Sequence, residues 1–257
     1  MNNLFDSHTH LDDEKFDGDR EEIIQKIYNS GVTMLANIGC DVKSSENSVK
    51  LAEKYHFIYA TVGIHPHDTE SMTEQTLEYI EKLAQNKKVV AIGEIGLDYY
   101  YENSKRDIQK YWFKRQLELA NKLDMPVTIH NRDAHGDTME ILKSTPARGI
   151  IHCYSGSSEM ARQLVDMGFY ISFAGPLTYK NSKNAVESVK VIPIDRLLIE
   201  TDSPYLAPTG FRGQRNDSSL VRYVCEKMAE IKGLSFEETA EITFNNAKKV
   251  YGIDNII

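Results

Sequence analysis

Cysteine is scarce in this chain of 257 residues, which contains only Cys40, Cys153 and Cys225. The three cysteines are far apart, odd in number and include no Cys-x-x-Cys pair, so a disulfide framework is excluded as the basis of the fold. Unpaired thiols are typical of proteins in a reducing compartment. We therefore expect a cytoplasmic protein.

Long hydrophobic runs are also missing. No apolar stretch approaches the roughly 20 residues that a helix needs to cross a bilayer. Acidic residues interrupt the N-terminal segment at Asp6, Asp12, Asp13 and Glu14, which does not fit a signal peptide. These two absences predict a protein without a membrane association, and nothing in the sequence indicates an obligate protein partner.

Positive charge is in deficit, because 30 Lys and Arg stand against 38 Asp and Glu and give a net charge of −8. This balance argues against a broad basic surface that grips nucleic acid. It does not exclude a polyanionic substrate, since bound metal ions can supply positive charge locally. A glycine-rich phosphate loop after the first strand is absent as well, which disfavours a doubly wound open sheet.

Short apolar runs rich in β-branched residues alternate with stretches of helical spacing along the whole chain. The strand-like runs are 4–10, 33–38, 58–64, 89–97, 127–130, 149–153, 169–173 and 197–201. Strand and helix thus alternate eight times at about 30 residues a unit, which predicts an α/β fold of the (β/α)8 TIM-barrel type. No Gly/Ser-rich linker breaks the series, so we expect a single domain over residues 1–257. Residues 219–232 and 235–251 are expected to form extra C-terminal helices, and the thinnest apolar face belongs to the expected helix 45–55.

Ionisable residues interrupt or end several of these apolar runs. In a barrel, catalytic groups belong at the carboxyl ends of the strands. His8 and His10 lie two apart on one strand, so their imidazoles project from the same face. The other residues of this kind are Glu94, His130, His152 and Asp202, with His65 and His67 after the third strand.

Each of these residues has an ordinary explanation by itself, such as an interior histidine or a buried ion pair. Their recurrence at one register of one fold instead predicts a metal site. Four histidines and two carboxylates exceed what one catalytic ion with an open position can use. They suit two divalent ions that share a hydroxide, with Glu94 as the bridge and Asp202 as the general base. These donors suit Zn, Mn, Ni, Co or Fe and accept Mg less tightly, so Mg, Mn and Zn all remain open.

Taken together, these motifs resemble the TatD family of metal-dependent deoxyribonucleases, a branch of the amidohydrolase-like barrels. The resemblance covers essentially the whole chain and rests on the segments 6–11, 63–67, 93–100, 126–130, 152–156 and 200–206. It implies that His8, His10, Glu94 and Asp202 hold one ion, and that Glu94, His130 and His152 hold the second. It also implies hydrolysis of phosphodiester bonds in DNA, often as a 3′→5′ exonuclease on single strands or ends.

Substrate contacts are expected from residues around the barrel mouth. We expect His65 to contact a phosphate and Tyr154 to stack on a base. Arg132, Arg215 and Asn216 are further candidates for binding the substrate. The family often has Arg-Asn-Glu-Pro where this chain has Arg-Asn-Asp-Ser at 215–218, so the start of the following helix departs from the family pattern.

Two other reactions could use the same centre. One is hydrolysis of a small amide or lactone, although Glu94 stands where many such enzymes place a modified lysine. The other is removal of a D-amino acid from a misacylated tRNA. A binding protein without catalysis is disfavoured, because so many ionisable groups in a barrel mouth cost stability that a scaffold has no reason to lose.

Overall fold

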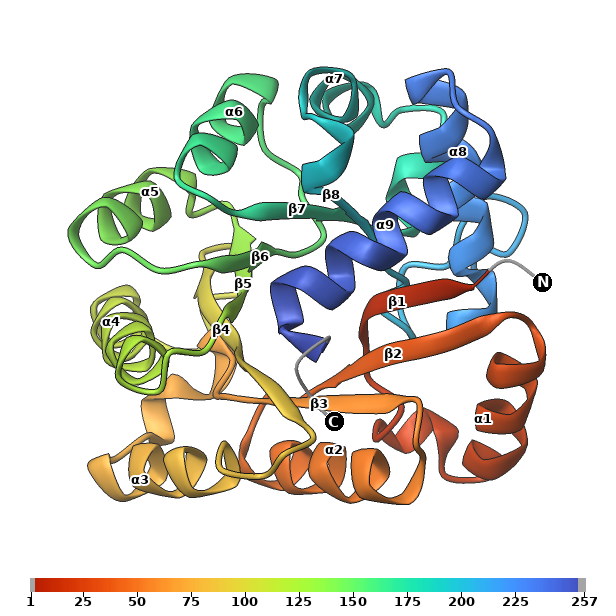
Figure 1. The fold of residues 1–257 in the computed structure, drawn as a ribbon. Helices are drawn as coiled ribbons and strands as arrows, with labels where there is room; N and C mark the ends of the chain where they lie inside the picture. The colour runs from red at the N-terminus through yellow and green to blue at the C-terminus, as the bar shows by residue number, and fades with distance from the viewer. Residues whose placement is uncertain (1–2, 254–257) are drawn as a thin grey trace. The chain divides into compact units, whose positions relative to one another are not determined.

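The computed structural model describes residues 3–253 of the chain (Figure 1). The fold is a (β/α)8 barrel, in which eight parallel strands stand in the sheet in the order of the sequence. The strands are β1 (Leu4–Thr9), β2 (Val32–Ile38), β3 (Ile58–Val62), β4 (Val89–Asp98), β5 (Val127–Arg132), β6 (Gly149–Ile151), β7 (Tyr170–Phe173) and β8 (Leu197–Ile199). The helices are α1 (Arg20–Asn29), α2 (Val42–Lys54), α3 (Glu74–Leu83), α4 (Arg106–Lys122), α5 (His135–Ser144), α6 (Ser158–Asp166), α7 (Lys183–Val191), α8 (Val221–Lys232) and α9 (Phe236–Tyr251).

The predicted fold class is therefore confirmed, while several boundaries differ from those expected. The runs predicted as 149–153 and 197–201 stop being strand at Ile151 and Ile199, so His152 and Asp202 lie on the loops that follow. In contrast, β4 and β5 continue one and two residues beyond the predicted ends, to Asp98 and Arg132. Polar residues at a strand end carry no periodic signal of their own, which explains why these ends differ by a few residues.

Local capping fixes where two of the helices begin. Helix α2 has a thin apolar face, but the Asp41 side chain accepts the Ser44 N–H and the Ser44 side chain accepts the Asp41 N–H, which closes a capping box. Its start is therefore Val42 and not residue 45. Helix α6 is capped by Ser157, whose side chain accepts the Met160 N–H.

By its internal contacts the described chain divides into two compact units. The first comprises residues 3–37 and 153–250, and the second comprises residues 38–152 and 251–253. The prediction of a single domain over residues 1–257 stays a prediction, and residues 1–2 and 254–257 lie outside the described part of the chain.

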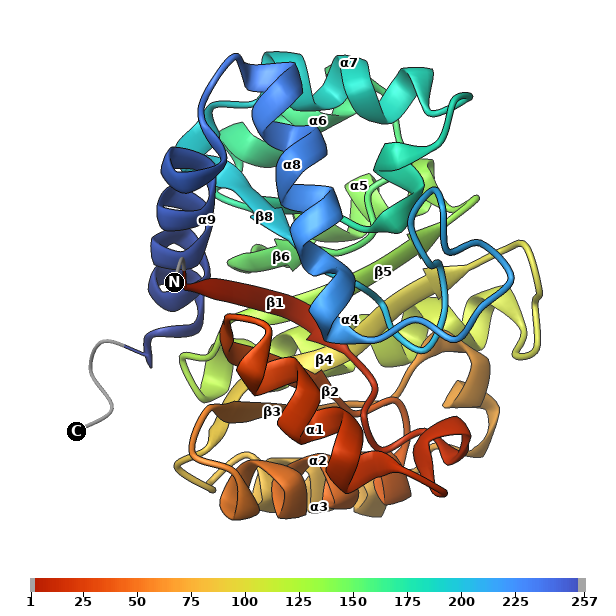
Figure 2. The same cartoon turned by 90° about the vertical axis from the view of Figure 1, so that its right-hand side faces the viewer.

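The first unit contains two strand pairs that meet at β1 and β8. Strand β1 pairs in parallel with β2, and β7 pairs in parallel with β8. Past the end of β8, the Asp202 N–H donates to the His8 carbonyl at 2.9 Å and the His10 N–H donates to the Ser203 carbonyl at 2.8 Å. Helix α9 passes beside β1, where the rings of Phe5 and Phe244 lie 6.0 Å apart (Figures 1 and 2). These contacts hold the carboxyl ends of β1 and β8 together.

The second unit is built on β3, β4, β5 and β6, which lie side by side in that order. All ten residues of β4 are buried, including Glu94 and Asp98. Helix α4 packs on β4 and β3 through buried amides, since the Gln116 side chain bonds to both backbone groups of Ile64. The Gln109 side chain does the same for Asp98, which fixes the end of β4.

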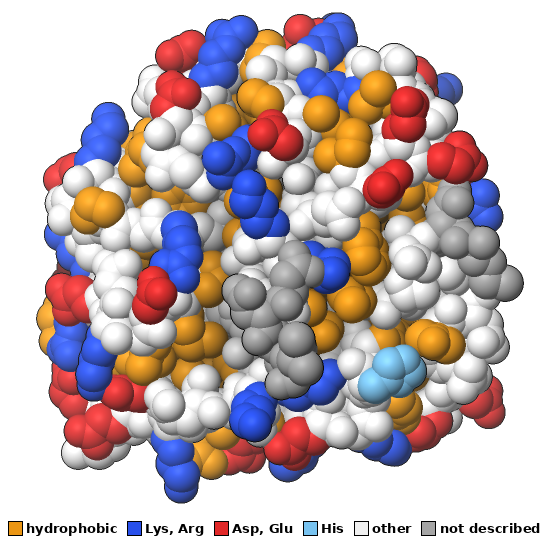
Figure 3. All heavy atoms as spheres, viewed as in Figure 1, with side chains coloured by type: hydrophobic (Ala, Val, Ile, Leu, Met, Phe, Trp, Pro, Cys, Tyr) orange, Lys and Arg blue, Asp and Glu red, His pale blue; other side chains and the backbone are white. Residues whose placement is uncertain are grey.

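The outer surface carries both signs of charge. On the face in Figure 3, Lys and Arg side chains are interspersed with Asp and Glu among the coloured residues. Within residues 3–253, no helix has the length and apolar character needed to cross a membrane.

Candidate metal centre

The first cluster of potential ligands lies at the carboxyl ends of β1 and β8. The Nε2 atoms of His8 and His10 are 3.1 Å apart. The Oδ1 atom of Asp202 lies 3.6 Å from the His8 Nε2 and 3.3 Å from the His10 Nε2. At metal–ligand distances near 2.0–2.1 Å, two tetrahedral ligands stand about 3.3 Å apart. The three donor atoms are therefore spaced as ligands of one cation would be.

The loop after β8 places Asp202 in this cluster. Asp202 has a φ of 53°, a left-handed conformation that is uncommon outside glycine. Its neighbour Thr201 donates its backbone N–H at 2.9 Å and its hydroxyl at 2.5 Å to the buried carboxylate of Asp6. The Asn216 amide donates to the carbonyls of Thr201 at 3.0 Å and Tyr205 at 2.7 Å. The backbone is thus held on both sides of Asp202.

Glu200 lies beside this cluster in the first unit and is fully buried. Its Oε1 accepts the Cys153 N–H at 2.8 Å, which joins the end of β8 to the start of the 153–157 loop.

The second cluster lies at the carboxyl ends of β4, β5 and β6, around Glu94. The Glu94 Oε1 atom is 2.9 Å from both the His130 Nδ1 and the His152 Nε2. The two imidazole nitrogens are 3.2 Å from each other. His65 completes a group with Glu94 and His130 in which the donor atoms all lie within 4.8 Å of one another. Glu94 is 3 % exposed, so an ionised carboxylate here needs positive charge close by.

His130 is oriented by Asp98, the last residue of β4. The His130 Nε2 lies 3.0 Å from the Asp98 Oδ2, which leaves Nδ1 directed at Glu94. Burial alone would lower the pKa of His130, but the hydrogen bonds to Asp98 and Glu94 outweigh it and raise that pKa. A carboxylate that fixes the tautomer of a ligating histidine is a recurring feature of metal sites.

His65 and His67 follow β3 and have different surroundings. The His65 Nδ1 accepts the His67 N–H at 3.2 Å, which leaves the proton on Nε2, 3.5 Å from the Glu94 Oε1. Burial and the neighbouring imidazoles hold the pKa of His65 well below its ordinary value. His65 is therefore a neutral N–H donor. The His67 Nε2 lies 3.1 Å from the Asp98 Oδ2, so His67 braces the same carboxylate.

Sequence reasoning missed two side chains of the second cluster. Asp98 was absent from the predicted site, although Glu94, Gly96 and Asp98 alternate along one strand, and this period of two was a usable signal. Cys40 also escaped prediction, and its Sγ lies 3.6 Å from the Glu94 Oε2. The sequence offered no signal for Cys40, because it lies on a loop whose path depends on tertiary packing.

Three of the residues predicted to bind substrate, Arg132, Tyr154 and Arg215, make contacts within the protein. Arg132 ends β5, and its guanidinium lies over the rings of Tyr100 at 3.9 Å and Tyr101 at 4.8 Å. Tyr154 is buried and donates its hydroxyl to the Ser157 carbonyl at 2.6 Å. Arg215 donates to both carboxylate oxygens of Asp19.

Asn216 is fully buried, and its amide nitrogen donates to the backbone carbonyls of Thr201 and Tyr205. This geometry makes Asn216 a brace for the Asp202 loop. Binding of substrate by Arg132, Tyr154, Arg215, Asn216 and His65 stays a prediction.

The donor sets of both clusters fit divalent cations. Neutral imidazoles and carboxylates are ligands that Zn, Mn and related ions prefer. The structure unites His8, His10 and Asp202 in the first unit, and Glu94, His130 and His152 in the second.

Comparison with known proteins agrees with this chemistry. A family model described as TatD related DNase matches residues 5–252. The uncharacterized metal-dependent hydrolase YabD of Bacillus subtilis strain 168 is 48% identical over 254 residues, which cover 98% of this chain and 100% of that protein. The 3′-5′ ssDNA/RNA exonuclease TatD of Pantoea ananatis is 34% identical, with 97% of this chain and 100% of that protein covered.

The solved structures lead to the same family. The crystal structure of YjjV, a TatD homolog from Escherichia coli K12, matches with a TM-score of 0.91 at 30% identity and covers 97% of this chain and 98% of that chain. Because the family model spans nearly the whole chain and the relatives align over their full length, the resemblance seen in the motifs is confirmed. The chain belongs to the TatD-related DNase family of metal-dependent hydrolases.

Proposed function

We propose that this protein hydrolyses phosphodiester bonds in DNA, as a 3′→5′ exonuclease on single strands or ends that uses two divalent metal ions (Mg, Mn or Zn). The observation that carries the proposal is the pair of imidazole–carboxylate clusters, each with donor atoms at ligand spacing. The name of one relative, a 3′-5′ ssDNA/RNA exonuclease, supports the choice of substrate.

When bound, divalent ions would supply Lewis-acid chemistry and a nucleophile at neutral pH. In the first unit, His8, His10 and Asp202 would hold one ion. In the second unit, Glu94 would hold the other together with His130 and His152. The chain itself contributes fixed ligand directions, because each cluster is tied to strand ends by backbone hydrogen bonds.

Two side chains would act on the substrate side of these clusters. Asp202 would accept the proton of the attacking water, and its side chain is 16% exposed, so solvent can reach it. His65 would donate its Nε2 proton to a phosphate oxygen, since its low pKa keeps it neutral and its Nδ1 is occupied by the His67 N–H.

Single-stranded DNA also suits the surface beside the second cluster. Tyr100 and Tyr101 are 58% and 56% exposed, and both rings lie against the Arg132 guanidinium. Exposed aromatic rings next to a cation are typical of surfaces that bind the bases and phosphates of single strands. The acidic chain would thus bind DNA through local groups and metal ions, and not through a general basic surface.

The proposal is tested with protein stripped of metal by a chelator. We expect no cleavage of 5′-labelled single-stranded DNA until Mg²⁺, Mn²⁺ or Zn²⁺ is restored, and then a ladder that shortens from the 3′ end. Asp202→Asn should lower kcat by at least a hundredfold, whereas the exposed Asp195→Asn on the same unit serves as the matched control and should have no effect.

The competing reactions are measured on the same preparation. An amide and lactone panel and a D-aminoacyl-tRNA are assayed beside the DNA at equal enzyme and metal concentrations. Turnover of either class that exceeds DNA cleavage would overturn the proposal. So would cleavage of DNA that survives Asp202→Asn unchanged.

A further inference from the structure

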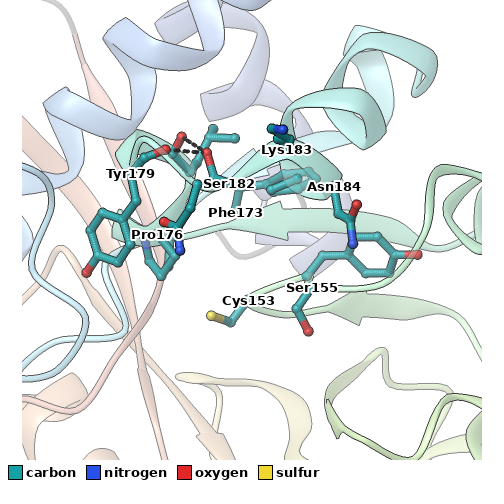
Figure 4. A pocket seen from close by; sticks show the side chains of 13 residues that line it. Cys153, Ser155, Phe173, Pro176, Tyr179, Ser182, Lys183 and Asn184 are labelled. Atoms are coloured by element: carbon teal, nitrogen blue, oxygen red, sulfur yellow. Dashed lines mark hydrogen bonds between the residues drawn. The ribbon is translucent and has the colours of Figure 1, made fainter.

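The first unit contains a cavity of about 500 Å³ that neither ligand cluster uses. Three segments surround it: the loop after β6, the end of β7 with the short 3-10 helix η3 (Gly175–Thr178), and the start of α7. Figure 4 shows Tyr179 and Pro176 on one side, Ser155 and Asn184 on the other, and Phe173 behind. Cavities of this size are typical of sites for small ligands.

The walls of the cavity are aromatic. Tyr154 and Phe173 are buried, and their rings meet edge to face at 6.0 Å and 77°. The Tyr179 ring is half-buried on the opposite side, and the Arg212 guanidinium lies 4.6 Å from its centroid. Flat apolar walls of this kind favour a planar ring as the occupant.

The rim of the cavity is polar and exposed. Asn181 and Asn184 bring amide groups that both donate and accept hydrogen bonds, and Lys183 brings a positive charge. A ligand that fits both the aromatic walls and the polar rim has a planar heterocycle with polar edges and an attached anion. A nucleobase with its phosphate has this chemistry.

Hydrogen bonds join the cavity to the loop that carries Asp202. The Tyr179 hydroxyl donates to the Ala207 carbonyl at 2.8 Å. The Thr209 hydroxyl donates to the Thr178 carbonyl, also at 2.8 Å. A ring held against Tyr179 would therefore be fixed relative to the backbone that positions Asp202.

We propose that this cavity binds a nucleobase of the DNA strand, with the base against the Tyr179 and Phe173 rings and the Asn184 amide at its polar edge. Lys183 is placed to attract a phosphate of the same strand. The inference rests on the proposed function, because it assigns part of the DNA substrate to a second feature of the same enzyme.

The test compares two oligonucleotides that differ only in their bases. One is a short oligothymidylate, and the other has the same backbone with abasic tetrahydrofuran residues. Removing a base that stacks on an aromatic side chain should lower kcat/KM and binding roughly 5- to 150-fold. Dissociation constants for both oligonucleotides are measured on the metal-free protein, where cleavage is absent.

Substitutions of residues that line the cavity test whether the preference for the base-bearing strand arises there. Tyr179→Leu and Asn184→Ala should each reduce the preference for the base-bearing strand at least about threefold; base contacts of Tyr100 and Tyr101 would account for the remainder. Tyr179→Phe keeps the ring but loses the bond to Ala207, so it should retain the preference. Lys183→Ala should weaken the binding of both strands by the same factor. The matched control is Lys180→Ala, an exposed lysine outside the cavity, which should have no effect on binding. Thermal unfolding of each variant verifies that it is folded.

The outcomes separate the inference from the function it rests on. One outcome is that neither strand is cleaved, but the base-bearing strand binds more tightly and Tyr179→Leu reduces this preference. That outcome would refute the exonuclease and support the cavity. Cleavage of both strands at equal rates and equal binding would overturn the cavity assignment while the exonuclease stands. An equal loss of kcat/KM and binding affinity for both strands in Tyr179→Leu would also overturn the cavity assignment. Such a result would show that Tyr179 only holds the Asp202 loop and does not contact a base.

Discussion

The replacement Asp98→Asn isolates the contribution of one carboxylate to the second cluster. Asp98 is 1% exposed and accepts four hydrogen bonds. Its Oδ1 accepts the backbone N–H groups of Tyr100 and Tyr101, both at 2.9 Å. Its Oδ2 lies 3.0 Å from the His130 Nε2 and 3.1 Å from the His67 Nε2.

An asparagine at this position can keep its oxygen on the two backbone groups, but then its NH₂ group faces the imidazoles. His130 would have to accept at Nε2 and carry its proton on Nδ1, the atom that lies 2.9 Å from the Glu94 Oε1. A protonated Nδ1 cannot bind a metal. Loss of such an orienting partner lowers metal affinity about 10- to 100-fold, which corresponds to about 1.4–2.7 kcal/mol.

The measurement is calorimetric titration of chelator-treated protein with Mn²⁺ or Zn²⁺. We expect one binding step to weaken by this factor in Asp98→Asn and any other step to stay unchanged. Asp137→Asn is the matched control, because Asp137 accepts the Tyr99 hydroxyl on the outer surface. Nitrogen NMR of His130 should show the proton on Nε2 in the native protein and on Nδ1 in the variant. If the metal affinities of the native protein and Asp98→Asn differ by less than about twofold, or if the His130 tautomer is unchanged, Asp98 does not orient His130 for a metal.

Three further predictions follow from individual contacts. Asn216→Ala removes both bonds that hold the Asp202 loop and should cost about 1–3 kcal/mol of unfolding free energy in denaturant titration, with a fall in kcat; an unchanged kcat would remove its role as a brace. The hydrogen bond from Arg215 lowers the pKa of Asp19, so this pair stabilises the fold above the unfolded pKa and is lost as the pH falls through the lower folded value; Arg215→Gln should raise the NMR titration midpoint of Asp19, and an unmoved midpoint would contradict the pairing. Burial raises the pKa of the Cys225 thiol to about 12, so a thiol reagent at pH 8 should modify Cys225 only on unfolding, and rapid modification of the folded protein would contradict its burial.

The fold was predictable because the strands of a parallel barrel are buried on both faces. Such strands appear in the sequence as continuous apolar runs. The ionisable residues stood out against these runs, so the residue pattern alone was enough to select His8 and Glu94. Capping residues such as Ser157, which precedes α6, also mark helix starts in a sequence.

Other parts of the site depend on information that one sequence does not carry. Whether an amide binds a phosphate or a backbone carbonyl depends on burial, and Asn216 is buried where a surface loop was expected. The cavity beside Tyr179 is formed by irregular backbone around η3, which has no periodicity to read. Asp98 is the intermediate case, because its alternation with Glu94 was visible but its contact with His130 depends on the register between β4 and β5.

Anomalous diffraction from crystals loaded with Mn²⁺ and a short DNA phosphorothioate is the sharpest test of a two-ion centre that acts on DNA. We expect one anomalous peak bound by His8, His10 and Asp202 and another bound by Glu94, His130 and His152, with a phosphate group beside at least one of them. The absence of a peak from both clusters at saturating Mn²⁺ would contradict this assignment.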